Sequence, residues 1–414
     1  MLQYSKTVSA ARPSDLKLNN RRQILELFKF GTVHAVADLA QEVGVSRQTV
    51  MKSIQYFLEK GIIISDGKAD SGSRGGKRAE IFRLSGDRCL LSLIVWSDEL
   101  SITLINFRCE TLDTRLLTDT GHLSAEDIVN LACETCKDML EARGIGLSEL
   151  CGLCVTASGI VGGDGTQRKS ALFPGWGRRM SIAQAFRERL GKDLLVIEED
   201  MGKVCGSALL HDLNAPGERV AAIVTFRDEI SLCLISRGEI FTGIGNFARE
   251  FGHMIVASDD MEVCVCGSRG CLERQVSATR LKSLMAENAG RFPASPLSAL
   301  EAMTVRDVFK ASAAGDALAG WLSGCAARQY AHALRNLALV FDPDRVVLQG
   351  EYAHSDAVFR EKLREELMTF KGFTRDDAPE MPFKLEADDR PLRTLASLGA
   401  YTLLIDRLFS EDLR

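Results

Sequence analysis

A histidine and three closely spaced cysteines are the residues whose types and spacing most clearly indicate chemistry in this chain. His253 is followed, after ten residues, by the loop Cys264-Val265-Cys266-Gly267-Ser268-Arg269-Gly270-Cys271. Closed structural sites hold Zn²⁺ by four tetrahedral nitrogen and sulfur ligands, and one imidazole with three thiolates is a standard set. Glycine permits the backbone conformations of a tight loop, so the cysteines can fold back toward one centre. The spacing predicts a structural zinc site formed by His253, Cys264, Cys266 and Cys271.

Two other cysteine pairs indicate packing rather than a second metal site or a redox pair. Cys133 and Cys136 lie in a helical pattern, whereas Cys151 and Cys154 lie in an apolar run typical of a buried strand. Free cysteine often behaves as a small hydrophobic side chain. Packing of this kind is also the alternative to a zinc site in the loop 264–271, which would then hold three buried thiols beside an unrelated histidine.

Length and composition indicate a globular protein with more than one packed unit. The chain has 414 residues, of which 46% are hydrophobic, and this exceeds what a single core usually accommodates. No apolar run approaches the roughly 20 residues of a membrane helix, and residues 1–20 lack the apolar centre of a signal peptide. We therefore expect a cytoplasmic protein with no membrane partner, whose twelve cysteines are reduced thiols or metal ligands.

Charge divides the chain into two parts. Residues 1–85 contain 14 Lys and Arg against 8 Asp and Glu, whereas residues 86–414 contain 37 against 48. A basic module on an acidic body indicates nucleic acid as the partner of the first part, and small ligands or other proteins as partners of the second. We therefore expect two domains, 1–85 and 86–414.

The basic part has the sequence pattern of a helix-turn-helix. Apolar residues at helical spacing predict helices over 21–30 and 35–42, after which Gly44 turns the chain. Ser46 is well placed as the N-cap of a third helix that ends at Gly61. Polar side chains on the exposed face of this helix could reach base edges or phosphates in a major groove. The candidate DNA-contacting residues at its start and on this face are Ser46, Arg47, Gln48, Thr49, Lys52 and Ser53.

A predicted hairpin follows the third helix. Residues 62–64 and 81–84 read as strands on either side of a loop rich in Gly, Ser and basic residues, which is the pattern of a wing. Its tip carries Arg74, Lys77 and Arg78, which could lie along phosphates or enter a minor groove. The alternative is a three-helix protein-interaction module with a solvated basic loop, because a helical pattern alone does not prove groove binding. The basic face favours double-stranded DNA.

Beyond residue 86, predicted strands and helices alternate, which indicates an α/β body. The expected strands are 90–95, 102–107, 152–156, 194–197, 220–225, 231–236 and 345–348, and the expected helices are 125–143, 182–190 and long helices within 305–339. Two lobes with a cleft between them are the simplest arrangement.

Five short motifs are distributed along the chain, namely Gly-Gly-Lys-Arg at 75–78, Ser-Gly-Ile-Val at 158–161, Phe-Pro-Gly-Trp at 173–176, Glu-Phe-Gly-His at 250–253 and Cys-x-Cys-Gly-x-x-Gly-Cys-x-Glu at 264–273. Together with the helix-turn-helix, these motifs resemble the ROK family of bacterial transcriptional repressors and sugar kinases. The similarity runs nearly end to end. The resemblance implies a winged helix-turn-helix followed by a two-lobed, actin-like α/β domain, with its zinc loop at 253–273.

The resemblance also implies a sugar pocket beside the zinc-binding histidine. Glu250, His253 and Glu273 match the family's contacts to sugar hydroxyls, and Asp200 matches the aspartate that acts as general base in its kinases. Glu199 stands where the family usually has asparagine, and it joins the candidate ligand-binding residues. Carboxylates and imidazole suit this role because they accept hydrogen bonds from hydroxyls. The alternative for Asp200 is that it only caps a helix beginning at residue 201.

The chain departs from the family's kinases on the nucleotide side. Their Asp-x-Gly-Gly-Thr turn is replaced by Val-Trp-Ser-Asp-Glu-Leu at 95–100, and their Gly-Thr-Gly-x-Gly loop by Phe-Arg-Asp-Glu-Ile at 226–230. A third element, usually Gly-Gly-Gly, reads Gln-Gly-Glu at 349–351. Backbone cradling of phosphate needs small residues and available N–H groups. We therefore expect that ATP binding and kinase activity are lost.

These observations predict a DNA-binding regulator, with repression expected, of carbohydrate-related genes that is not an enzyme. It would respond to a sugar or sugar derivative and act as a homodimer or homotetramer on a palindromic operator. The added charge of Glu199 favours a neutral or amino sugar over a phosphorylated one, unless Arg178, Arg179 or Arg249 comes near. The alternatives are a sugar kinase with a fused DNA-binding module, control by a protein partner instead of a sugar, and an interaction module that does not bind DNA.

Overall fold

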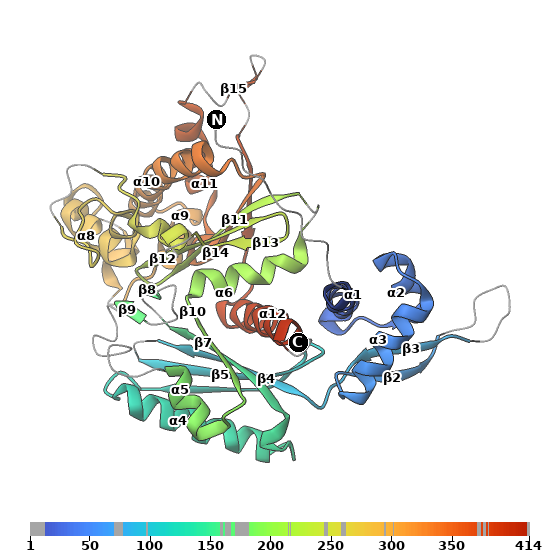
Figure 1. Ribbon diagram of the computed structural model, residues 1–414. Coiled ribbons are helices and arrows are strands. Elements are labelled where there is room, and N and C mark those ends of the chain that lie inside the picture. The colour runs from blue at the N-terminus through green and yellow to red at the C-terminus, as the bar shows by residue number, and fades with distance from the viewer. Residues whose placement is uncertain are drawn as a thin grey trace, which may run out of the picture.

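Two five-stranded mixed sheets with the same strand order organise the larger part of the chain (Figure 1). In the first sheet, the antiparallel meander β4–β5–β6 continues beyond β4 with β7 and β10, which run parallel to β4. The second sheet repeats this plan with the meander β11–β12–β13 and the parallel strands β14 and β17. The strands are β4 Cys89–Val95, β5 Glu99–Asn106, β6 Thr111–Thr118, β7 Leu150–Ala157, β10 Leu195–Glu199, β11 Arg219–Phe226, β12 Glu229–Ser236, β13 Glu239–Phe241, β14 Arg345–Gly350 and β17 Lys384–Asp388. The predicted two-lobed α/β body is thus confirmed.

Helices cover the outer faces of both sheets. On the first sheet they are α4 (Ala125–Glu141), which begins at a capping box made by Ser124 and Asp127, and α5 (Ile182–Leu190). The second sheet packs against a larger helical layer in one hydrophobic core. The helices of this layer are α7 Leu272–Val276, α8 Ala278–Asn288, α9 Val305–Ala313, α10 Ala317–Phe341 and α11 Ala357–Met368.

Two further helices, α6 (Met201–Ser207) and α12 (Leu392–Glu411), lie between the sheets (Figure 1). They touch backbone to backbone, because a Cβ on Gly399 would lie 1.7 Å from the carbonyl oxygen of Val204. Any larger residue at Gly399 would push the helices apart. The helix α12 therefore has a fixed position against the segment that follows β10.

The N-terminal unit contains three helices and a small antiparallel sheet with the strand order β1-β3-β2. Its elements are α1 Pro13–Leu27, β1 His34–Ala35, α2 Val36–Val43, α3 Arg47–Glu59, β2 Ile63–Lys68 and β3 Glu80–Leu84. The second and third helices and the hairpin match the predicted positions. The first helix begins eight residues before the predicted start, because its polar first turns carry no apolar periodicity, and it ends before Phe30, where φ is 60°.

The hydrophobic core of the N-terminal unit continues into the core around α12. At the junction, the backbone N–H of Phe30 donates to the Tyr401 hydroxyl at 3.2 Å, and this hydroxyl donates to the carbonyl of Phe107 at 2.8 Å. Lys29 forms an ion pair with Asp406 of the same helix. The C-terminal helix therefore connects the N-terminal unit with the space between the two lobes.

The computed structural model describes residues 13–69, 78–96, 98–157, 160–161, 167–169, 182–213, 215, 217–243, 247–257, 262–293, 295–300, 302–370, 374–375, 378–379 and 381–411. The described residues also include two small pairs of strands, namely β8 Ile160–Val161 with β9 Gln167–Lys169, and β15 Thr374–Arg375 with β16 Ala378–Pro379. Within this described part, none of the helices combines the length and the apolar character that crossing a membrane requires.

Candidate functional site

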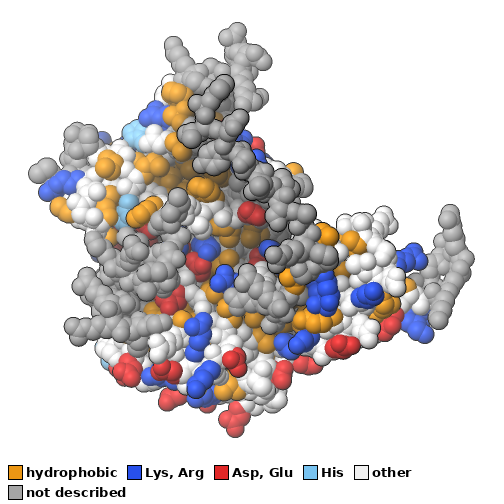
Figure 2. Space-filling model, viewed as in Figure 1, with side chains coloured by type: hydrophobic (Ala, Val, Ile, Leu, Met, Phe, Trp, Pro, Cys, Tyr) orange, Lys and Arg blue, Asp and Glu red, His pale blue; other side chains and the backbone are white. Residues whose placement is uncertain are grey.

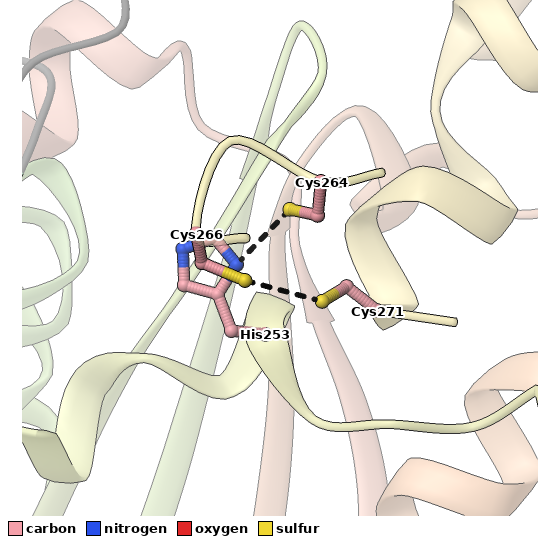
Figure 3. Close-up of side chains that lie close together, drawn as sticks. All are labelled: His253, Cys264, Cys266 and Cys271. Atoms are coloured by element: carbon pink, nitrogen blue, oxygen red, sulfur yellow. Dashed lines mark hydrogen bonds between the residues drawn. The ribbon is translucent and has the colours of Figure 1, made fainter. Parts of the chain in front are cut away.

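The structure brings the four predicted zinc ligands together (Figure 3). The ligand atoms of His253, Cys264, Cys266 and Cys271 all lie within 4.8 Å of one another. The Cys264 Sγ is 3.5 Å from the His253 Nδ1, and the Cys266 and Cys271 Sγ atoms are also 3.5 Å apart. Two sulfurs bound to one tetrahedral Zn²⁺ at about 2.3 Å are separated by about 3.8 Å. Both the donor set and its spacing therefore fit a zinc ion.

Backbone contacts fold the cysteine loop around this centre. The Cys264 N–H donates to the Ser268 carbonyl at 2.8 Å, and the Gly267 N–H donates to the Cys264 carbonyl at 2.8 Å. Gly270 has φ +75°, and a Cβ there would lie 1.7 Å from the carbonyl oxygen of Ala257. Only glycine fits this position, so the fold-back that aligns Cys271 with Cys264 depends on Gly270.

The three thiols differ in their electrostatic surroundings. Burial raises the pKa of Cys271 to about 11, and it holds the pKa of Cys264 well above its ordinary value. At Cys266, burial is outweighed by hydrogen bonds, first from Ser268, which lower the pKa of this thiol. Zn²⁺ binds the thiolate form, so its binding would release protons from these groups.

Two carboxylates flank the imidazole of His253. The Glu273 Oε1 lies 3.2 Å from His253 Nδ1 and 3.1 Å from Cys264 Sγ, while the Glu250 Oε2 lies 3.7 Å from His253 Nε2. Burial, with the nearby charge of Asp200, raises the pKa of Glu250 to about 7. The three residues matched to sugar contacts therefore stand together at the edge of the cysteine loop.

Asp200 is held on several sides. It is the N-cap of α6, where its Oδ1 accepts the Lys203 N–H at 3.1 Å and the Ser231 hydroxyl at 2.9 Å. Its Oδ2 forms an ion pair with Arg249. Asp200 and Arg249 are each only 7% exposed. The capping role that the sequence offered as an alternative is therefore present, together with a buried ion pair that the sequence did not reveal.

Glu199 is neutralised by two cations. It forms an ion pair with Lys203, one helical turn later, and lies 3.6 Å from Arg249. Burial raises the pKa of Glu199, and Lys203 opposes this shift. The spacing of four residues could have revealed the partner Lys203, and Arg249 is one of the three arginines that the sequence analysis allowed to approach, but no sequence signal places Ser231 here. The carboxylate cluster is therefore less negative than its sequence suggests.

The predicted DNA-contacting residues of α3 fall into two groups. Arg47, Gln48 and Lys52 are exposed, whereas Ser53 is 5% exposed and its hydroxyl donates to the Thr49 carbonyl at 3.2 Å. Ser53 therefore differs from the expectation, since it faces the core and not the surface. The Thr49 side chain is partly exposed and shares a hydrogen bond with the side chain of Ser46 at 2.9 Å, and the latter also accepts the Thr49 N–H as the predicted N-cap.

Lys and Arg side chains are visible at several places on the N-terminal unit (Figure 2). In the hairpin, Arg78 is exposed. Several residues named in the sequence analysis lie outside the described residues, namely Arg74, Lys77, Ser158, Gly159, Arg178, Arg179 and the segment 173–176.

The two other cysteine pairs lie where the sequence predicted. Cys133 and Cys136 are buried in α4, and Cys151 and Cys154 are on β7. Burial raises the pKa of Cys133 to about 11 and the pKa of Cys136 to about 12. These buried neutral thiols pack against apolar neighbours and do not belong to the metal-ligand cluster.

Comparison with known proteins finds similarity to both a glucokinase and a repressor. A glucokinase of Halalkalibacterium halodurans is 27% identical over 208 residues, which cover 49% of this chain and 62% of the glucokinase. The chain thus spans less than two thirds of that relative. The xylose repressor of Caldicellulosiruptor bescii is 19% identical over 354 residues, which cover 84% of this chain and 87% of the repressor.

Among solved structures, a ROK family transcriptional regulator, described as a homologue of the Escherichia coli MLC protein, shares the fold. It superposes with a TM-score of 0.78 at 15% identity, covering 96% of this chain and 99% of the regulator. The shared fold therefore includes the N-terminal unit. The family model described as ROK matches residues 96–398, well over half of the chain. The resemblance inferred from the motifs is confirmed, and the chain belongs to the ROK family.

Proposed function

We propose that this protein is a zinc-containing transcriptional regulator that binds double-stranded DNA, responds to a sugar or sugar derivative in its cleft, and does not act as a kinase. The observation that carries the proposal is the buried ion pair of Asp200 and Arg249. Asp200, the residue matched to the kinases' general base, already forms an ion pair with Arg249. The exposed face of α3 carries side chains suited to DNA.

A general base must reach the proton of the substrate hydroxyl through a hydrogen bond. At Asp200, Oδ1 accepts two hydrogen bonds and Oδ2 pairs with Arg249. Freeing Oδ2 would leave the buried guanidinium of Arg249 with only the more distant carboxylate of Glu199, 3.6 Å away, and this loss of a close partner is costly. The environment of Asp200 therefore favours a structural role over proton transfer.

The nucleotide side supports the same conclusion. The segments at 95–100 and 226–230 contain bulky and acidic residues where the family's kinases have glycines. At 349–351, burial raises the pKa of Glu351 to about 7, and the charge of Asp228 adds to this shift. Such surroundings offer neither the small residues nor the positive potential that a triphosphate needs.

The DNA-binding role rests on the N-terminal unit, for which we retain the division into 1–85 and 86–414. The helices α2 and α3 with the hairpin β2–β3 match a winged helix-turn-helix, in which the second helix enters the major groove. Arg47, Gln48 and Lys52 are the exposed candidates for base or phosphate contacts. Arg78 on the hairpin, with Arg74 and Lys77 from the sequence, would contact the backbone. A homodimer or homotetramer on a palindromic operator follows from this mode of binding.

The zinc ion would order the loop that carries the sugar-contact residues. His253, Cys264, Cys266 and Cys271 would hold it, and bound Zn²⁺ would supply a fixed tetrahedral anchor. Because Glu273 contacts both His253 and Cys264, the same anchor orients its carboxylate. Glu250 and Glu273 then accept hydrogen bonds from ligand hydroxyls. Since Arg249 is already paired with carboxylates, a neutral or amino sugar suits the site better than a phosphorylated one.

The test combines DNA binding with an assay of catalysis. Fluorescence anisotropy of the zinc-loaded full chain on DNA from upstream of its own gene should show tight binding that weakens with salt and changes with one sugar of a neutral, amino and phosphorylated panel. A coupled assay with MgATP and the same sugars should show no phosphorylation. Absence of DNA binding together with measurable phosphorylation would overturn the proposal.

The similarity to a glucokinase supports a second candidate, a sugar kinase with a fused DNA-binding module. In that case phosphorylation would be detectable, and Asp200→Asn would abolish it, because the amide cannot accept the proton from the sugar hydroxyl. The assay of sugar phosphorylation therefore distinguishes the two candidates.

A further inference from the structure

Two hairpin turns, one from each lobe, meet through a pair of aromatic rings. Trp96 directly follows β4 and is 6% exposed, and Phe226 is the last residue of β11. Their ring centroids are 4.8 Å apart and their planes differ by 17°, which is a stacked arrangement. The turns occupy corresponding places in the two sheets, between the first and second strands of each meander.

Charged residues surround this stack. The Arg227 Nη2 lies 2.6 Å from the Asp98 Oδ1, so the same two turns are also joined by an ion pair. From the beginning of α12, Arg393 lies over the Trp96 ring at 5.2 Å and contacts Glu99 at 2.7 Å. Three elements therefore converge at Trp96: the β4–β5 turn, the β11–β12 turn and the first turn of α12.

We propose that Trp96, Phe226, Asp98 and Arg227 form a latch that holds the two lobes together without a nucleotide. This inference rests on the proposed regulatory function and names a device that controls it. The stacked rings carry most of the latch, because Trp96 is buried and Phe226 packs against the same hydrophobic core, whereas the exposed ion pair mainly sets the relative position of the turns.

The latch also excludes phosphate from the space between the turns. The stacked rings of Trp96 and Phe226 lie in this space with their centroids 4.8 Å apart, and Asp228 adds a negative charge at the same turn. A polyphosphate would have to separate the rings, and the two cations at this place, Arg227 and Arg393, already form ion pairs with Asp98 and Glu99. The lobes are therefore held by side chains of the protein itself.

The position of α12 connects the latch to the N-terminal unit. Arg393 touches the latch at one end of the helix, and Tyr401 contacts Phe30 in the N-terminal unit two turns later. A change in lobe separation that opened the latch would move the start of α12. The latch thus sets the resting separation of the lobes, and an effector in the cleft must act against it.

Hydrogen exchange of the full chain, monitored by mass spectrometry, tests this inference. Phe226→Ala should speed exchange at 98–106 and 229–236 by about fivefold or more, because local opening becomes easier. Arg227→Ala, which changes an exposed side chain and preserves the core, should produce a smaller increase in the same segments. Asp98→Ala should add nothing in the Arg227→Ala background, since both substitutions remove one ion pair.

Phe292→Ala is the matched control, because it also removes a partly exposed phenyl ring from an aromatic pair, here with Trp321 of α10. It should leave both segments unchanged. The latch is refuted if Phe226→Ala behaves like Phe292→Ala, or if calorimetry shows that the wild-type protein binds MgATP at micromolar concentration. These readouts need no DNA or sugar, so failure to bind an operator would overturn the proposed function while leaving the test of the latch intact.

Discussion

The guanidinium of Arg249 lies against the carboxylate of Asp200, and both residues are buried. Because Asp200 also caps α6, the pair links the start of that helix to the segment that carries Glu250 and His253. A buried ion pair adds little net stability while intact, since desolvation offsets attraction, but the loss of one partner leaves an uncompensated charge. The pair therefore fixes the geometry of the cleft.

Substitution of Arg249 by alanine should lower the free energy of unfolding by about 3–5 kcal/mol, because Asp200 would remain buried without its partner. The double variant Asp200→Asn with Arg249→Ala should recover part of this loss. Arg115→Ala, which removes an exposed ion pair with Asp113, should cost less than about 1 kcal/mol. Urea unfolding measures all three, and a loss below 1 kcal/mol in Arg249→Ala would show that the buried pair is not needed.

Substitution of Cys266 by serine should abolish stoichiometric zinc binding, because one of four ligands is lost. Metal analysis of the purified protein should find about one Zn²⁺ per wild-type chain and little in the variant. The control Cys325→Ser changes a half-buried thiol outside the cluster and should retain the metal. Equal zinc content and equal thermal stability in both variants would contradict the assigned ligand set.

Glu351 should make stability depend on pH. Burial, followed by the charges of Asp228 and Asp307, raises its pKa from 4.5 to about 7 in the folded protein. Between these two pH values the folded state binds a proton that the unfolded state does not. The resulting stabilisation is complete below about pH 4.5 and is lost as pH rises through 7. Between pH 5 and 8, the unfolding free energy of the wild type should therefore decline by about 2 kcal/mol more than that of Glu351→Gln. Parallel curves for the variant and the wild type would contradict it.

The zinc cluster could be predicted because most of its ligands are local in sequence. Cys264, Cys266 and Cys271 lie within one loop, so their spacing reports their geometry directly. In contrast, Arg249 and Asp200 are 49 positions apart, and Trp96 and Phe226 belong to different lobes. Their pairing depends on how the two sheets face each other, and no local pattern contains that information.

Two of the elements missed by sequence reasoning, β6 and α12, have different physical reasons for it. The edge strand β6 is mostly exposed and alternates only weakly between polar and apolar residues, so it gave no strand signal. The helix α12 packs between the lobes and against the N-terminal unit, which blurs the amphipathic pattern by which a surface helix is recognised. Buried central strands such as β4 were found because they are continuous apolar runs.

Loss of the Tyr401 hydroxyl should weaken the junction between α12 and the N-terminal unit. This hydroxyl accepts the Phe30 N–H and donates to the Phe107 carbonyl, so Tyr401→Phe would leave two backbone groups without their partner. We expect a loss of about 1–3 kcal/mol in unfolding free energy and faster hydrogen exchange at residues 29–31. Tyr352→Phe, which removes a hydrogen bond to Val276, should destabilise the chain without changing exchange there. Identical exchange at 29–31 in both variants would contradict a specific junction.

Exposed basic residues of α3 should determine how operator affinity depends on salt. If Lys52 contacts a phosphate, Lys52→Ala should weaken binding on all sequences and reduce the slope of log K against log salt by about 1. If Arg47 reads a base edge, Arg47→Ala should cost about 1–3 kcal/mol and relax specificity at one position. Lys310→Ala, which removes the same charge from an exposed position on α9, should leave both affinity and slope unchanged. Anisotropy titrations at several salt concentrations separate these effects, and an unchanged slope in Lys52→Ala would remove Lys52 from the phosphate contacts.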